Sequence, residues 1–382
     1  MADSEDLVQV DRSSETYKEF ARLYQIAQEL HPGGENGWKN ELYARTDAKW
    51  GGFHNKDGSI RLNQRLVLDH LTGGEPSADP EAQAQALATV LHESKHARSS
   101  IDAPNEPNAV RNLTSIALNE AFVEISTVDD FRTFADRAGY DGMPDPEPEY
   151  QGAVQAGNAL LDRVTTSAQQ RAELVQTVVD SPTVMGWDTI ADTIVRNELA
   201  DVVPPDPEHQ QAARAHLINQ MAIPEWDGVQ HRPGRGGMVA ELTVDGIDRG
   251  VGQLREHYQQ NPGEPYPARM PNPAAAVSTD LRAGEQQRAV TNEAGTRLQS
   301  PGRTEPVDLA KLPPPDAGTR VSVGAGQGEA MRFLQDQAPA AGATHRRPEL
   351  GDGARGAGAP AGAGVSRPGA DRGAGPSPRG LE

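Results

Sequence analysis

The sequence predicts an α+β fold: a small mixed sheet packed on one long helix, then a mainly helical second lobe and a C-terminal tail. A hairpin pattern at residues 49–63 precedes a series of helical patterns. From about residue 261, proline, glycine and alanine dominate, and all 4 tryptophans lie before that point. Such a tail buries too little apolar surface to offset the entropy that folding removes. We therefore expect a flexible N-terminus at 1–12, one domain at 13–260 and a largely disordered tail at 261–382.

The first elements are a helix and a hairpin. The helix is predicted at residues 14–30, where apolar side chains recur at helical spacing before a proline-glycine run. In the hairpin, the β-prone runs 49–54 and 59–63 flank Asp57-Gly58, a dipeptide typical of tight turns. Apolar and polar residues alternate in the second run, which predicts one buried face. His54 is then expected on the hairpin surface and not as a ligand.

The next helix carries the motif His92-Glu93-Ser94-Lys95-His96. The preceding Asp79-Pro80-Glu81 is typical of a helix start, and no helix breaker follows before Arg98, so the helix is predicted at about 81–98. Positions i and i+4 lie one turn apart on the same face, so the two histidines can share one zinc ion. Glu93 points toward the same edge and can take a proton from a water activated by that metal.

A second helix is predicted around Glu120, and residues 129–138 continue or follow it. Leu113 and Ala117 share one face with Glu120 and Glu124. Two carboxylates one turn apart are mildly unfavourable unless a cation lies between them. The pattern therefore predicts Glu120 as the third protein ligand of a catalytic zinc site. Glu124 is expected to accept the outer ring N–H of a ligand histidine.

The run His92-Glu93-x-x-His96, followed by Asn119-Glu120-Ala121-x-x-Glu124, resembles the gluzincin branch of the zincin metallopeptidases. The resemblance covers these two helices and the hairpin before them. It implies a zincin-like fold, zinc held by the two histidines and Glu120, and Glu93 as general base for peptide-bond hydrolysis. It also implies a strand beside the cleft that pairs with an extended substrate.

The third ligand has an alternative in Asp102, six residues after His96. Some zincins place their third ligand there, after a glycine that lets the helix end and the chain turn back. Ser99 stands at that position in this chain, which makes the left-handed turn less easy. We therefore favour Glu120.

Gluzincins also supply a histidine or tyrosine from the later lobe, which stabilises the oxyanion formed during hydrolysis. His216 is the preferred candidate, because apolar neighbours on its helix suggest partial burial. The other candidates are Tyr140, Tyr150, His209 and His231. An acidic loop is expected at 141–149, and further helices at 151–164, 167–179, 187–199 and 207–221.

Composition narrows the function classes. The chain has 36 basic and 55 acidic residues, of which residues 261–382 hold 14 and 13, so residues 1–260 carry a net charge of −20. An acidic body argues against binding to nucleic acid or to an anionic membrane. Without cysteine, disulfides and thiolate ligands are excluded. The acidic N-terminus and the lack of an apolar stretch of about 18 residues lead us to expect a cytoplasmic protein.

The sequence thus predicts a zinc-dependent peptidase, more specifically an endopeptidase that acts on a peptide or protein substrate. Three alternatives stay open. One is a zincin without activity that serves as a binding or regulatory module, and another is a delivered protease effector whose tail is a loading or linking segment. The third is a hydrolase that uses iron or cobalt in place of zinc. Short helices are expected in the tail at 281–298 and 328–337.

Overall fold

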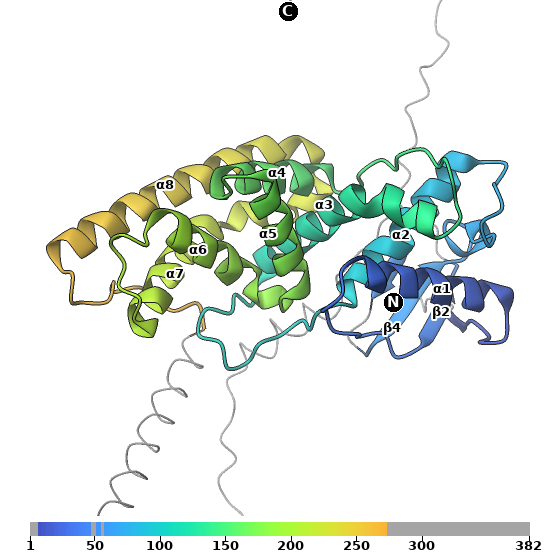
Figure 1. Cartoon of the computed structure of the whole chain (residues 1–382), viewed down its shortest axis with the longest axis horizontal. Coiled ribbons are helices and arrows are strands. Elements are labelled where there is room, and N and C mark those ends of the chain that lie inside the picture. Colours follow the sequence, from blue (N-terminus) through green and yellow to red (C-terminus); the bar gives the residue numbers. More distant parts are fainter. Residues whose placement is uncertain (1–6, 47–50, 55–56, 273–382) are drawn as a thin grey trace, which may run out of the picture. The chain divides into compact units, whose positions relative to one another are not determined.

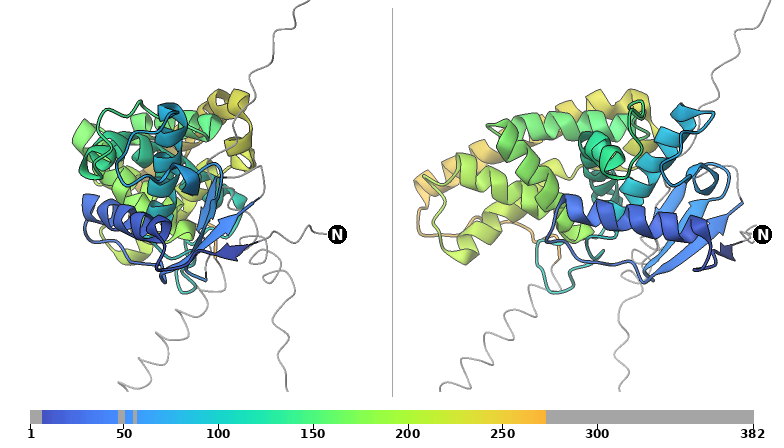
Figure 2. Two further views of the ribbon diagram at one scale, coloured as in Figure 1. Left: turned by 90° about the vertical axis from the view of Figure 1, so that its right-hand side faces the viewer. Right: turned by 45° about the vertical axis from the view of Figure 1, so that its right-hand side comes forward.

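The computed structural model describes residues 7–46, 51–54 and 57–272, and it confirms an α+β architecture (Figure 1). The strands lie together with helices α1 (Glu15–Leu30) and α2 (Pro80–His96). Helices α5 to α8 lie together beyond α3 (Leu113–Arg137), as the turned views also show (Figure 2).

The sheet is mixed, with strand order β1-β2-β4-β3. β2 runs parallel to β4, whereas β1 and β3 run antiparallel to their neighbours. β3 and β4 form the predicted hairpin, in which Phe53 is in register with Arg61. The strand bounds are Val8–Gln9 for β1, Glu41–Arg45 for β2, Gly52–His54 for β3 and Ser59–Asn63 for β4. The two strands that the sequence pattern misses, β1 and β2, are held by partners far along the chain.

The first apolar core lies between the sheet, α1 and α2. Ile60 and Leu62 of β4 are fully buried, as the sequence pattern predicts, but the predicted wet face is not observed, because Ser59 and Asn63 are buried as well and Arg61 is only partly exposed. Helix α2 begins as predicted: the Asp79 side chain accepts a hydrogen bond from the Ala82 amide at 3.0 Å, and Pro80 takes the first helical position. The core also contains Phe20, Leu23, Leu42, Leu87 and Leu91.

Helix α3 belongs to two apolar cores. Its first half, including Ala117 and Phe122, packs into the core of the helical lobe. Its second half, including Phe131 and Phe134, packs into the core built on the sheet. The predicted continuation of this helix through residue 137 is confirmed. Because one rigid element serves both cores, a side chain on α3 is held firmly relative to α2.

The helical lobe confirms four predicted helices and adds one. The confirmed helices are α4 (Gln151–Val164), α5 (Ala168–Asp180), α6 (Gly186–Glu198) and α7 (Pro207–Met221). The additional helix is α8 (Gly236–Gln260). Glycine disfavours a helix, yet α8 packs so closely on α7 that a methyl group at Gly246 would lie 2.2 Å from the Gln220 carbonyl oxygen. Packing therefore outweighs the intrinsic preference here. Five 3₁₀ turns complete the described part: Leu68–His70, Thr183–Met185, Pro224–Trp226, Val229–His231 and Pro233–Arg235.

Residues 261–272, which composition assigns to the disordered tail, are part of the folded structure and are called the strap below. The Asn272 amide donates to the Pro107 carbonyl oxygen at 2.8 Å, and the Tyr266 ring lies 4.2 Å from that of His216. The helices expected at 281–298 and 328–337 lie outside the described residues. Among the described residues, no helix is long and apolar enough to cross a membrane.

Candidate metal centre

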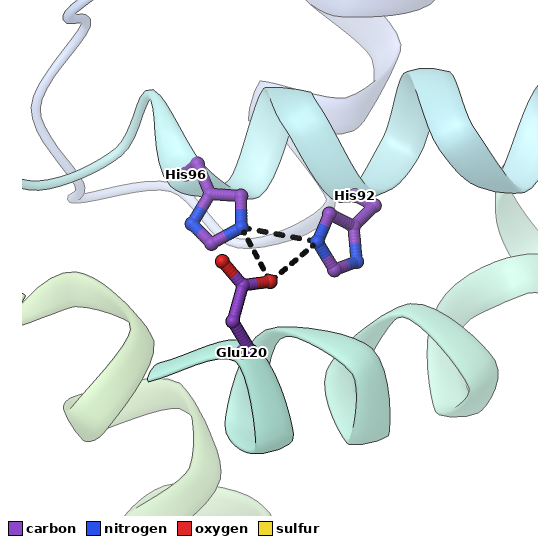
Figure 3. A group of neighbouring side chains, drawn as sticks. All are labelled: His92, His96 and Glu120. Carbon is purple, nitrogen blue, oxygen red and sulfur yellow. Dashed lines mark hydrogen bonds and ion pairs between the residues drawn. The ribbon is translucent and has the colours of Figure 1, made fainter. Parts of the chain in front are cut away.

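Three side chains on α2 and α3 converge on one point (Figure 3). His92 and His96 project from successive turns of α2 toward Glu120 on α3. Each offers one donor atom, and these atoms all lie within 4.8 Å of one another. This buried group can hold a metal ion, and it is the set that the motif and the second helix predict.

The spacing of the donor atoms fits a small tetrahedral ion. The Nε2 atoms of His92 and His96 are 3.0 Å apart, and Glu120 Oε2 lies 3.3 Å from the first and 3.4 Å from the second. Bonds of 2.0–2.1 Å at tetrahedral angles place neighbouring ligand atoms about 3.3 Å apart. The three observed separations are close to the edges of such a tetrahedron.

Glu124 fixes the orientation of the His92 ring. Its Oε2 lies 2.9 Å from His92 Nδ1, and its Oε1 accepts a hydrogen bond from the Glu149 amide at 2.8 Å. A carboxylate oxygen accepts hydrogen bonds, so Nδ1 donates its N–H to Glu124, and Nε2 is the ring nitrogen that faces Glu120 and His96 and would bind a metal ion through its lone pair. The predicted role of Glu124 as partner of a ligand histidine is therefore matched by the observed contacts.

The candidate centre is buried, and its electrostatic environment favours positive charge. His92 and Glu120 are 1% and 2% exposed, and the His96 side chain is 13% exposed. Burial acts to lower the pKa of His92, but its hydrogen bonds to Glu120 and Glu124 and their charges raise that pKa well above its usual value. Burial acts to raise the pKa of Glu120, yet the neighbouring histidines lower it to about 2. Positive charge is thus strongly favoured between these groups, and either a proton on His92 or a bound metal ion would supply it.

Glu93 sits beside the donors in a space that a glycine leaves open. It is 2% exposed and follows His92 on α2. A methyl group at Gly52 of β3 would lie 2.8 Å from Glu93 Cγ and 3.0 Å from its Oε1. The edge strand therefore approaches the Glu93 carboxylate closely because it has no side chain at this position. Sequence reasoning missed Gly52, although a glycine inside a β-prone run signals a close backbone approach.

Tyr150 is the aromatic side chain that contacts the centre. Its ring centroid lies 5.8 Å from that of His92 and 6.5 Å from that of His231. Burial raises the pKa of Tyr150 well above 10, and the charges of Glu120, Glu149, Glu93 and Glu124 raise it further. The phenol therefore keeps its proton and remains a hydrogen-bond donor.

The preferred candidate His216 has other neighbours. Its Nε2 lies 2.9 Å from Gln253 Oε1 on α8, and its ring packs on Tyr266 of the strap. The apolar neighbours that favoured His216 reflect its burial between α7, α8 and the strap, and burial lowers its pKa despite the Gln253 hydrogen bond. The structure brings Tyr150, rather than His216, next to His92, and His231 lies against Tyr150.

The remaining candidates also have partners elsewhere. Asp102 Oδ1 accepts hydrogen bonds from Arg111 Nε and from the Ala103 amide, both at 2.8 Å, and it is not in the metal-binding group. The Tyr140 hydroxyl donates to Glu19 at 2.8 Å. The His209 ring lies against Tyr258.

Comparisons of this chain with protein-family models, with curated proteins and with solved structures found no match. The function therefore has to be argued from the geometry of the centre.

Proposed function

We propose that the protein is a zinc-dependent peptidase. The observation that carries this proposal is the convergence of His92, His96 and Glu120 at the spacing of tetrahedral ligands, with Glu93 next to the first of them. Three protein ligands leave a fourth position for water or substrate, as in catalytic zinc sites.

Zinc suits this donor set better than other metals. Two imidazoles and one carboxylate, without a thiolate, form a borderline set that zinc binds well in tetrahedral geometry. Hard cations such as magnesium and calcium prefer six or more oxygen ligands, which this centre lacks among the described residues. When bound, zinc polarises a carbonyl group and lowers the pKa of water.

Glu93 is the general base in this proposal. Its carboxylate accepts a proton from the attacking water and later delivers a proton to the nitrogen of the leaving amine. A carbon–oxygen bond forms and the carbon–nitrogen bond breaks, giving a carboxylate and an amine. Glu124 and the Glu149 amide hold His92 in the tautomer that directs Nε2 inward.

Tyr150 is the proposed oxyanion donor. It is 4% exposed, its ring contacts that of His92, and its high pKa keeps the hydroxyl protonated. A neutral phenol can donate its O–H to the negative charge that develops on the carbonyl oxygen. His231, whose ring lies against Tyr150, is the second candidate for this role.

The fold around the centre supports a zincin-like assignment. The edge strand β3 runs antiparallel to β4 and approaches Glu93, and the motif helix α2 follows the hairpin in sequence. The third ligand comes from the next helix, α3. This order of hairpin, motif helix and ligand helix is the one that the gluzincin resemblance implies.

The test combines elemental analysis with peptide turnover. About one zinc per wild-type chain is expected, lost in His96→Ala and Glu120→Ala. Glu93→Gln should retain zinc but lose hydrolysis of a mixture of synthetic peptides, monitored by mass spectrometry. A wild-type chain that binds no zinc after reconstitution, or a Glu93→Gln variant that remains active, would refute the proposal.

A further inference from the structure

A basic segment lies next to the metal centre in an otherwise acidic body. Residues 231–235 form the last part of the connection from α7 to α8 and include His231, Arg232 and Arg235, all exposed. Residues 1–260 carry a net charge of −20, so a local excess of positive charge is unusual on this surface. Such a segment attracts anions over several ångströms.

The fold fixes this segment at the start of α4, beside Tyr150. A methyl group at Gly152 would lie 2.6 Å from the Val229 carbonyl oxygen and 2.7 Å from that of Arg232. The His231 ring lies 6.5 Å from that of Tyr150, which in turn contacts His92. The Tyr150 ring thus separates His231 of the segment from the candidate ligand His92.

The two arginines of the segment differ from the other arginines of the helical lobe in their ion pairs. Other arginines of the helical lobe are paired: Arg163 with Glu198, Arg214 with Asp188 and Arg255 with Asp201. Within residues 7–46, 51–54 and 57–272, neither Arg232 nor Arg235 makes an ion pair. Their guanidinium groups therefore remain available for a carboxylate, which they can bind through two parallel hydrogen bonds.

Charges of opposite sign flank Tyr150 and limit where a substrate carboxylate can go. The loop that leads into Tyr150 is acidic; its Asp145 pairs with Arg132, and its Glu149 accepts from Gln85. A carboxylate is repelled by this loop and attracted by residues 231–235. The metal donors are 1–13% exposed, which favours a chain end over the middle of an extended polypeptide.

We propose that His231, Arg232 and Arg235 bind a carboxylate of the substrate close to the scissile bond. This inference rests on the proposed peptidase function and names its substrate class. A carboxylate can come from the C-terminus of a peptide or from an aspartate or glutamate side chain. The buried donors favour the C-terminus, so the enzyme acts as a C-terminal exopeptidase and not as the endopeptidase that the sequence predicts.

The first test uses the zinc-loaded protein and synthetic peptides of mixed sequence. Each peptide is made with a free C-terminal carboxylate, with a C-terminal amide, and as an amide with glutamate near its end. The free acids are expected to be cleaved at least about 5-fold more efficiently than the amides, mainly through a lower KM. Preference for the glutamate amides would assign the side chain as the source of the carboxylate. Equal cleavage of all three forms would overturn the inference.

Substitution of the segment identifies the groups responsible. Arg232→Gln/Arg235→Gln should abolish the preference while zinc content stays at the wild-type level. The matched control is Arg12→Gln/Arg137→Gln, which removes two positive charges at exposed residues that make no ion pair in the described part of the chain. This control should keep the preference. If both double variants lose it equally, net charge rather than residues 231–235 explains the effect.

A second test does not depend on turnover. The protein is titrated with succinate at constant ionic strength, and the His231 ring protons are followed by NMR, assigned with His231→Gln. A saturable shift is expected, with a dissociation constant at least about 5-fold higher in Arg232→Gln/Arg235→Gln. No shift would overturn the carboxylate site, even in an active peptidase. A shift without any peptide cleavage would retain the site and reject the peptidase.

Discussion

At the level of single residues, the space around Glu93 is set by Gly52. A methyl group there would lie 2.8 Å from both Glu93 Cγ and Leu62 Cδ2, so one of them must move. Leu62 is packed in the core, which leaves Glu93 as the side chain that yields. Under the proposed peptidase function, we therefore expect Gly52→Ala to lower peptide turnover at least about 10-fold, with zinc content unchanged, because a displaced Glu93 would transfer protons poorly.

The control for this variant is Gly252→Ala on α8, where an added methyl group meets nothing within 4 Å. It should leave both turnover and zinc content unchanged. Wild-type turnover in Gly52→Ala would show that Glu93 does not depend on the open space at β3.

Glu124 offers a second prediction at this scale. Both of its oxygens accept hydrogen bonds, from His92 Nδ1 and from the Glu149 amide. A glutamine must turn its NH₂ group toward one of these donors, so Glu124→Gln should weaken zinc binding about 10- to 100-fold. Competition with a chromophoric chelator measures the change, with the exposed Glu241→Gln as control. Unaltered affinity would contradict the orienting role.

Some residues of the candidate centre are predicted by sequence patterns within one helix, whereas others are brought there only by tertiary packing. The spacing of His92 and His96 is a property of one helix, and the Glu120 and Glu124 pattern is a property of the next, so the sequence predicts both sets. The approach of Tyr150 to His92 depends on how α4 packs on α3, which no local pattern encodes. Burial at His216 was correctly inferred, but burial alone does not say which site a histidine faces.

At the level of elements, a partly buried ion pair joins Lys95 of α2 to Asp130 of α3, next to the candidate ligand His96 in sequence. Lys95 is 2% exposed, and its Nζ contacts Ser126 Oγ at 2.7 Å and Asp130 Oδ2 at 2.5 Å. Burial lowers the pKa of Lys95 even though the Asp130 charge opposes this. The pair therefore contributes little net stability, whereas removal of one partner leaves an uncompensated charge.

We expect Asp130→Asn to lower the free energy of unfolding by about 3–5 kcal/mol. The double variant Lys95→Met/Asp130→Leu should recover most of this loss, because it removes both charges. Urea denaturation of the zinc-loaded proteins measures both values. A double variant less stable than the single one would show that the pair itself, and not the stranded charge, is important.

The same pair predicts a pH dependence. Burial acts to raise the pKa of Asp130, but hydrogen bonds and charges from His31 and Lys95 lower it below its usual value. The folded pKa is then below the unfolded value of about 3.9, so this group stabilises the protein above that pH and loses the contribution as pH falls further. The stability difference between wild type and Asp130→Asn should shrink below about pH 4. A difference that stays constant from pH 6 to pH 3 would contradict this assignment.

Helix α8 shows why one element escaped prediction. Its glycines weaken the helical signal, yet the backbone of α7 approaches Gly246 and side chains of α7 approach Gly250, so tertiary packing requires small residues there. Strands β1 and β2 escaped for a related reason, since their pairing is non-local. In contrast, α2 and α4 carry clear start signals or a clean apolar face, and their predicted bounds are close to those observed.

At the level of the whole molecule, the strap packs on the helical lobe and reaches the connection between α2 and α3. Asn219 Nδ2 donates to the Arg269 carbonyl oxygen at 2.8 Å, and Asn272 Nδ2 donates to that of Glu106 at 3.0 Å. Residues 97–112 carry the chain from His96 to α3, so the strap anchors part of the segment that connects α2 to α3. Composition alone did not reveal this, because a proline-rich segment can be ordered by the surface on which it packs.

The strap gives the last prediction, which compares two shortened chains. A chain that ends at residue 260 loses the Tyr266 ring from His216 and the hydrogen bonds of Asn272, whereas a chain that ends at residue 272 keeps them. We expect the shorter chain to have a Tm lower by about 5 °C or more, since 1 kcal/mol shifts the Tm of a domain this size by about 2–4 °C. Its zinc affinity should fall as well, because the segment between α2 and α3 loses its hydrogen bonds to Asn272. Differential scanning calorimetry of the two zinc-loaded chains measures the difference. Equal Tm values would mean that residues 261–272 lie on the lobe without stabilising it, as their composition suggests.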